Sequence, residues 1–193
     1  MREQLLKRNQ AVSCKHDVCK RQTELWYFMN VEENTMTRKT VTRALEWLRP
    51  LGISLTLYFA YYLGRDSRAQ FHIMGPIIVM IMSGTVAFES LVLGEAASEK
   101  IGYPPNRAYQ IQSGLANLAT AVTALLVYAL EWGSFAEATI VTAMLIFFAL
   151  SALNHLASAV MANNMKPANL TRPAVALLLT GLLLPPMLAA LKQ

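Results

Sequence analysis

The chain has 193 residues, of which 54% are hydrophobic and only 15% are charged. Because soluble domains usually carry about 25% charged residues, this composition argues against an ordinary soluble globule and predicts a protein embedded in a membrane. The formal net charge is +5, and ten of the 17 Lys and Arg residues lie in residues 1–49. An excess of basic residues before the first span is typical of a membrane protein whose N-terminus lies in the cytoplasm. The sequence carries no nucleic-acid-binding motif, so nucleic acid is not an expected partner.

The N-terminal segment, residues 1–44, is polar, and we expect it to be a disordered cytoplasmic extension. Residues 1–35 lack helical periodicity and the apolar core of a signal peptide, which leaves either a native tail or upstream mistranslation before Met36. The segment holds Cys14 and Cys19 with His16 between them. These three ligands do not predict a zinc site, because structural zinc needs four ligands and no second pair follows.

Five apolar segments occupy the rest of the chain. A helix needs about 20 residues to cross ~30 Å of hydrocarbon, and backbone polar groups inside a bilayer must be satisfied within the protein. The sequence therefore predicts an all-α, integral membrane helical bundle in one domain, residues 45–193. The predicted spans are residues 47–64, 73–94, 108–130, 138–161 and 173–191. The first has the shortest apolar stretch, and we expect Arg49 to reach the membrane interface beside it.

Lys and Arg residues next to the spans predict the orientation. If the N-terminus lies inside the cell, the inner segments hold 14 of these residues and the outer segments hold 3. We therefore predict a multi-pass protein of the inner (cytoplasmic) membrane, with its N-terminus in the cytoplasm and its C-terminus outside. Aromatic residues near the predicted span ends suit the membrane interface.

Polar residues gather at one predicted depth in three of the spans. In this orientation Glu89, Gln110, Asn117, Asn154 and His155 all fall in the cytoplasmic half of the membrane. Helical spacing gives each span one polar stripe, so we expect these five residues to face the interior of the bundle. They are the candidate ligand-binding residues.

Two interpretations of this cluster stay open. Polar side chains often only join helices, at about 0.6 kcal/mol per contact. Glu89 and His155 differ from the amides because each can change charge, so they could pair, relay a proton or share a metal. One His and one Glu make an incomplete metal site, and the sequence names no cofactor. His72, at the outer interface, is expected to be solvated.

Two further features have a structural and a functional interpretation. The inner loop at residues 95–109 holds Gly102 and the pair Pro104-Pro105, which favour a turn. It is either a connector or a lid over the polar cluster. The pair Pro185-Pro186 lies deep in the last span, where it should kink or break the helix. It marks either a bent terminal helix or a gate.

At the inner loop of residues 95–109 and in the span that follows it, the chain resembles an uncharacterised family of bacterial multi-spanning membrane proteins, a domain of unknown function. The family pattern is I-G-W-P, then F-Q-x-E-x-G-x-A-N-L, then G-H-I on the next helix. The matching stretches are Ile101–Pro104, Tyr109–Leu118 and Asn154–Leu156. The chain departs from the pattern at Tyr103, Tyr109, Gln112 and Asn154, and Gln112 stands in place of a carboxylate. The resemblance implies no activity, but it supports a cluster at Gln110, Asn117 and His155.

The function predicted from these observations is the binding or movement of a proton, an ion or a small polar ligand near the cytoplasmic face. The alternative is a structural or assembly subunit without a ligand site of its own. An enzyme is not favoured, because no nucleophile elbow, phosphate-binding loop or metal-binding helix motif is present. Five spans without an inverted repeat are few for a self-contained transporter. The expected partners are therefore the lipid bilayer and, in addition, either further copies of the chain in a homo-oligomer or a larger membrane partner.

Overall fold

The computed structural model describes residues 37–38 and 40–192. The chain divides into two compact units, Met1–Val41 and Thr42–Gln193. The first unit, with Cys14, His16 and Cys19, lies almost entirely outside the described residues. The described part of the second unit is helical, with turns between helices and no strand. This confirms the predicted all-α helical bundle.

The first helix covers residues 40–63. It is followed by α2 (Ser67–Phe88), the π-helical turn η1 (Glu89–Leu93), α3 (Gly94–Ile101), α4 (Arg107–Ala129), α5 (Ser134–Met161) and α6 (Pro167–Ala190). Residues 40–44, which we expected in a disordered segment, are therefore helical.

Four helical stretches are long and apolar enough to cross a membrane: Ser67–Ile101, Arg107–Ala129, Ser134–Met161 and Pro167–Ala190. The chain is a membrane protein on this evidence. The first helix is not among the four described stretches that meet these criteria, although it covers most of the first predicted span. That it crosses the bilayer stays a prediction.

The helix boundaries follow from local chemistry. Asp66 caps α2 by accepting a hydrogen bond from the amide of Ala69 at 2.8 Å, and Asn106 caps α4 through the amide of Tyr109 at 3.1 Å. Short polar side chains are favoured there because they satisfy amides that have no partner in the first turn. Gly102 ends α3 with φ of 70°, a left-handed conformation that glycine adopts without strain.

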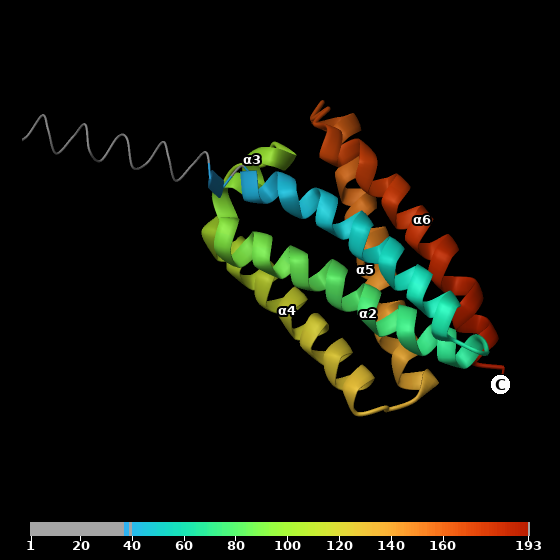
Figure 1. Cartoon of the computed structure of the whole chain (residues 1–193). Coiled ribbons are helices and arrows are strands. Elements are labelled where there is room, and N and C mark those ends of the chain that lie inside the picture. Colours follow the sequence, from blue (N-terminus) through green and yellow to red (C-terminus); the bar gives the residue numbers. More distant parts are fainter. Residues whose placement is uncertain (1–36, 39, 193) are drawn as a thin grey trace, which may run out of the picture. The chain divides into compact units, whose positions relative to one another are not determined.

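Helix α2 is the central helix of the bundle. It contacts α4, α5 and α6, and the first helix runs antiparallel beside it (Figure 1). Its buried residues Phe71, Met74, Ile78 and Val79 form the middle of the hydrophobic core. On the other side of the core lie Val141 and Met144 of α5 and Leu179 and Leu183 of α6. Every other long helix can therefore be positioned by its contact with α2.

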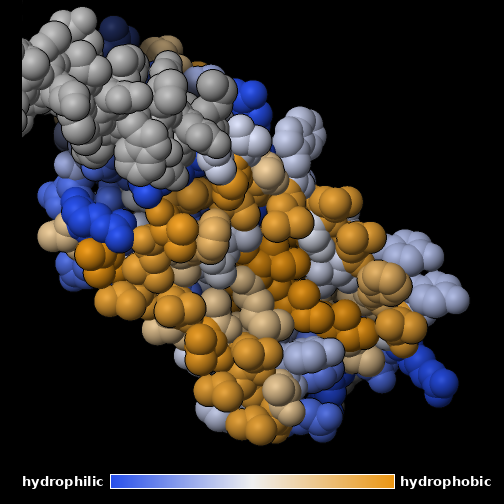
Figure 2. Space-filling view, turned by 60° about the vertical axis from the view of Figure 1, so that its left-hand side comes forward, coloured by the Kyte–Doolittle hydropathy of each residue, from blue (hydrophilic) through white to orange (hydrophobic). Residues whose placement is uncertain are grey.

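The outer surface of the bundle is strongly apolar. Val160, Leu177 and Phe135 have exposed fractions of 74–78%, and Figure 2 shows hydrophobic residues across the middle of one face with hydrophilic residues toward the ends. An apolar surface of this extent would be unusual in water, but it suits contact with lipid.

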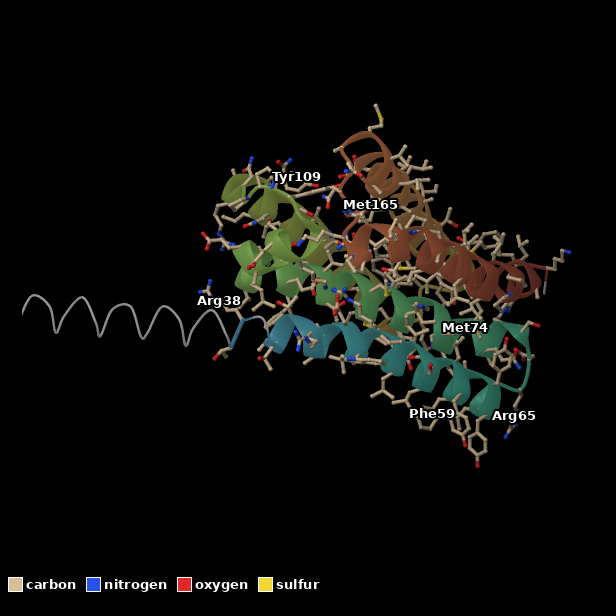
Figure 3. The ribbon with its side chains drawn as sticks, turned by 90° about the horizontal axis from the view of Figure 1, so that it is seen from above. Arg38, Phe59, Arg65, Met74, Tyr109 and Met165 are labelled. Carbon is tan, nitrogen blue, oxygen red and sulfur yellow. The ribbon has the colours of Figure 1, made fainter. Side chains whose placement is uncertain are left out.

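The bundle has two distinct ends. One carries α3 and the loops 102–106 and 162–166, and we call it the α3 end. The opposite end carries the turns 64–66 and 130–133 (Figure 1). Figure 3 shows Tyr109 and Met165 toward the α3 end and Arg65 at the opposite end.

Proline does not interrupt the helices where the sequence suggested it would. Helix α6 continues through Pro185 and Pro186 to Ala190, so the predicted break is absent. Helix α2 begins at Ser67, well before the predicted residue 73, which places Pro76 in its interior. Proline is tolerated inside a helix of a membrane bundle, because neighbouring helices and local adjustments of the backbone satisfy the carbonyl groups that lose their hydrogen bond.

Close packing of α4 against η1 depends on Gly114. A Cβ atom there would lie 2.6 Å from Cγ of Leu91, whereas a Cβ at Gly84 of α2 would meet only Ala121 at 3.9 Å. We expect Gly114→Ala to lower the free energy of unfolding by about 1–3 kcal/mol, because the helices must separate. Gly84→Ala is the matched control, and we expect it to be neutral or slightly stabilising. Equilibrium unfolding in detergent checks both; equal stability of the two variants would contradict the packing.

Candidate functional site

The structure buries four of the five predicted site residues. Glu89 lies in η1, Gln110 and Asn117 on α4 and His155 on α5, with exposed fractions of 3–6%. Asn154 is exposed, so the expectation that it faces the interior is wrong. The helical stripe of α5 turns His155 inward and leaves its neighbour at the surface, where the Asn154 amide lies 3.4 Å from the Tyr103 hydroxyl.

Glu89 is held between two cations. Its Oε2 lies 2.6 Å from Nη2 of Arg49, and its Oε1 lies 3.2 Å from Nζ of Lys100. Lys100 also pairs with Glu46 at 2.9 Å. Arg49 turns toward α2, where its Nε donates to Thr85 at 2.8 Å; that it reaches the membrane interface stays a prediction. A carboxylate buried in a membrane needs such partners, because its charge is costly there.

The π-helical turn that holds Glu89 is supported by Arg107. A π-helical turn departs from the α-helical hydrogen-bond pattern, and such turns occur frequently at functional sites. Arg107 donates to the carbonyls of Ser90 at 3.2 Å and Leu91 at 2.8 Å. Gly94 follows with φ of 28°, and a side chain there would collide with Arg107 and Gln110. The turn is therefore specified by residues on either side of it.

Gln110 and Asn117 hydrogen-bond within the protein. Gln110 donates to the hydroxyl of Ser98 at 2.6 Å, and Asn117 donates to the carbonyl of Ser113 at 2.9 Å, one turn earlier on the same helix. The Oε1 atom of Gln110 is buried without a partner among the described residues. The bond of Gln110 joins α3 to α4, whereas that of Asn117 lies within α4. Both match a structural interpretation of the amides.

His155 belongs to a second group of polar residues, separate from the partners of Glu89. Its Nδ1 lies 2.7 Å from Oδ1 of Asn169, and its Nε2 is hydrogen-bonded to Nη1 of Arg172. The ring stacks on Tyr103 with centroids 5.6 Å apart. Pairing of Glu89 with His155 was one of the possibilities left open by the sequence, and the structure gives each residue its own partners.

The hydrogen bonds define the tautomer of His155. Arg172 only donates, so Nε2 of His155 accepts and Nδ1 carries the proton that it donates to Asn169. The amide of Asn169 in turn donates to the carbonyls of Ile101 at 3.2 Å and Asn164 at 3.0 Å. A neutral imidazole therefore lies in a directed chain of hydrogen bonds that begins at Arg172.

The two loops at the α3 end are joined over this group. Asn164 donates to the carbonyls of Ile101 at 2.9 Å and Gly102 at 3.2 Å. A Cβ at Gly102 would lie 2.6 Å from the Asn164 side chain. The loop before α4 is thus tied to the loop before α6, and Tyr103 is positioned against His155.

Sequence reasoning did not identify Arg172 and Asn169 as site residues. Helix α6 begins at Pro167, whereas the predicted span begins at 173, so both were assigned to a loop. Their spacing of three residues places them on one face of a helix. The signal that could have found them is Pro167 itself, since proline is favoured in the first turn of a helix.

The opposite end holds a polar pair that was also missed. Nδ1 of His72 lies 2.5 Å from Oε1 of Glu137, whose side chain is 2% exposed. The His72 ring stacks on Tyr128 with centroids 4.8 Å apart. His72 was expected to be solvated, but it has these two contacts within the protein. Within the described part of the chain, no group of three or more His, Cys, Asp or Glu residues could hold a metal ion.

The ion pairs of Glu89 make a prediction about stability. Replacing Glu89 with Gln leaves Arg49 and Lys100 without their shared anion, so we expect the free energy of unfolding to fall by about 1–3 kcal/mol. Glu95→Gln makes the same chemical change at an exposed position nearby, and we expect no change. Unfolding of both variants in detergent checks this, and a Glu89→Gln protein as stable as the control would show that the pairs contribute nothing.

Comparison with known proteins gives a family but no activity. The model of a family of unknown function, DUF6790, matches residues 69–193. No curated protein and no solved structure matches the chain. The matched stretch includes η1, α3 to α6 and nearly all of α2, and it holds all five predicted site residues, whereas Arg49 and Glu46 of the first helix lie outside it. The expected resemblance to a family of unknown function is confirmed, and the chain belongs to DUF6790.

Proposed function

We propose that this membrane protein binds a small anion at Arg172, at the α3 end of the bundle. The observation that carries the proposal is the charge around that residue. Three cations, Arg49, Lys100 and Arg172, lie near two carboxylates, Glu46 and Glu89, and the charges of both carboxylates act on Arg172. Both carboxylates are already paired with other cations.

Arg172 therefore has no anionic partner of its own. Among the described residues its hydrogen-bond partner is the neutral ring of His155, and it forms no ion pair with a carboxylate. The side chain is partly buried, where an unmatched positive charge is costly. A bound anion would supply the missing charge.

The chemistry of the guanidinium group favours a carboxylate, phosphate or sulfate. Its planar fork of N–H donors matches two oxygens at once. His155 fixes one side of the group, because Asn169 holds the ring in place, and the remaining donors are left for a ligand. Tyr103 and Asn154 lie on the Nδ1 side of the His155 ring, so the ligand would be held chiefly by the guanidinium group.

The contacts of Glu89 and His155 narrow the range of ligands suggested by the sequence. A cation at Glu89 would have to displace Arg49 and Lys100. Proton transfer between Glu89 and His155 is not supported, because no contact joins them and His155 is bonded on both nitrogens. Within the original range of a proton, an ion or a small polar ligand, an anion fits the contacts best.

The distribution of basic residues supports a cytoplasmic location for the site. Lys100, Arg107, Lys166 and Arg172 belong to the α3 end, and Arg65, Arg68 and Lys192 to the opposite end. Together with the basic N-terminal segment, this supports an inner-membrane protein whose α3 end lies in the cytoplasm. The anion would then enter from the cytoplasm.

A structural role is the second candidate, and the contacts of Gln110 and Asn117 favour it. Gln110 joins α4 to α3 and Asn117 bonds to its own helix, so the amide groups of both side chains hydrogen-bond within the protein, as expected of residues with a structural role. A subunit of a homo-oligomer or of a larger membrane complex would need no more than this. Such a subunit would purify with its partner and would show no specific response to anions.

We expect Arg172→Gln to weaken anion binding by about tenfold or more, since hydrogen bonds to charged groups contribute about 1.5–3 kcal/mol. The measurement is the melting temperature of the full chain in nonionic detergent as phosphate or acetate is added at constant ionic strength. A ligand that binds the folded state raises this temperature. The wild type should respond and Arg172→Gln should not.

Lys166→Gln is the matched control, because it removes one positive charge from the same end of the bundle at an exposed position. It should respond to anions as the wild type does. Arg172→Lys should respond less than the wild type, because it keeps the charge but loses the planar fork. An equal response of Arg172→Gln and the wild type would contradict the proposed site.

A further inference from the structure

An apolar groove separates the first helix from α2 on the surface of the bundle. It has a volume of about 330 Å³ and is lined by Leu45, Leu48, Gly52, Met80, Ile81, Gly84, Thr85 and Phe88. Two of the lining residues are glycines, Gly52 of the first helix and Gly84 of α2. The only polar lining residue is Thr85, whose hydroxyl is already bonded to Arg49 and to backbone carbonyls of α2.

The groove lies on a helix that can cross the membrane. Its α2 side extends from Met80 to Phe88, which is about 12 Å of helix and less than half of the ~30 Å hydrocarbon core. Leu48 and Phe88 are 51% and 43% exposed, so the groove opens to the surroundings of the bundle. In a bilayer those surroundings are acyl chains, and an apolar hollow of this kind excludes water.

One end of the groove meets a cation. Arg49 contacts Thr85 through Nε and Glu89 through Nη2, while its Nη1 forms no hydrogen bond with the described residues. Lys100, 17% exposed, lies on the other side of Glu89. An oxygen of a phosphate group could accept a hydrogen bond from Nη1 without breaking either existing contact, next to the lining residue Thr85.

We propose that the groove is a binding site for one phospholipid, with part of an acyl chain between the first helix and α2 and the phosphate at Arg49. A phosphate is common to zwitterionic and anionic phospholipids, so the site selects a phosphodiester rather than a particular headgroup. This site is separate from the anion site at Arg172, and neither proposal depends on the other.

Native mass spectrometry of the full chain tests the proposal. Delipidated protein in detergent is titrated with phosphatidylcholine, with phosphatidylglycerol and with diacylglycerol, which lacks the phosphate. We expect one retained molecule of either phospholipid and about tenfold weaker retention of diacylglycerol. Equal retention of all three lipids would overturn the role of Arg49.

Ile81→Phe enlarges a side chain that lines the groove and lies against Gly52 of the first helix. Ile146→Phe is the matched control, because it makes the same change at an exposed position of α5 that does not line the groove. We expect the first variant to lose the retained lipid and the second to keep it. Leu48→Phe narrows the groove from the first helix, at a half-exposed position, and supplies the same test if Ile81→Phe fails to fold.

Unchanged lipid retention in folded Ile81→Phe and Leu48→Phe would overturn the proposal. So would a wild type that retains no lipid but forms a dimer that these two variants abolish. That result would assign the groove to a second copy of the chain.

Discussion

The interior of a bilayer offers no water, so every polar group placed there must find its partner within the protein or in a ligand. This constraint accounts for most of the polar contacts in the bundle. Glu89 has Arg49 and Lys100, Gln110 has Ser98, Asn117 has a carbonyl of its own helix, and His155 has Asn169. Arg172 is the charged group at the α3 end that meets only a neutral ring, and the proposed anion would supply its missing partner.

The arrangement of the helices makes these contacts available. Helix α2 packs against α4, α5 and α6, and its extension through η1 and α3 carries Glu89, Ser98 and Lys100 to one end of the bundle. Arg107 supports the π-helical turn from the start of α4. The loops before α4 and α6 are joined through Asn164. Charged and polar residues from the first helix, α3, α4, α5 and α6 are thereby collected at the α3 end.

The family match includes only some of the charged residues at the α3 end. It begins at residue 69, so Glu89 and Lys100 lie in the matched stretch, whereas Arg49 and Glu46 do not. The first helix thus supplies one of the two cations that hold Glu89. It also supplies one side of the apolar groove. The first helix, which lies outside the matched stretch, therefore contributes both to the ion pairs of Glu89 and to the surface that faces lipid.

The fold was largely predictable from the sequence because long apolar segments in a membrane can only be helices. The inward faces of Glu89, Gln110, Asn117 and His155 were also predictable, since helical spacing alone groups them. The partners were not, because Arg49 and Lys100 reach Glu89 from other segments. Asn169 and Arg172 were hidden by a helix that starts six residues earlier than hydropathy indicated. Asn154 was predicted to face the interior because it is polar. It is exposed, because His155 takes the inward position on α5 and the adjacent residue points to the surface.

The most direct test of the unmatched charge is crystallographic. Crystals of the full chain would be soaked with selenate, a sulfate analogue with a strong anomalous signal. The account predicts an anomalous peak within hydrogen-bond distance of the Arg172 guanidinium, on the side away from His155, with Glu89 still paired to Arg49 and Lys100. An empty site, with the carboxylate of Glu89 or Glu46 turned to pair with Arg172, would contradict it.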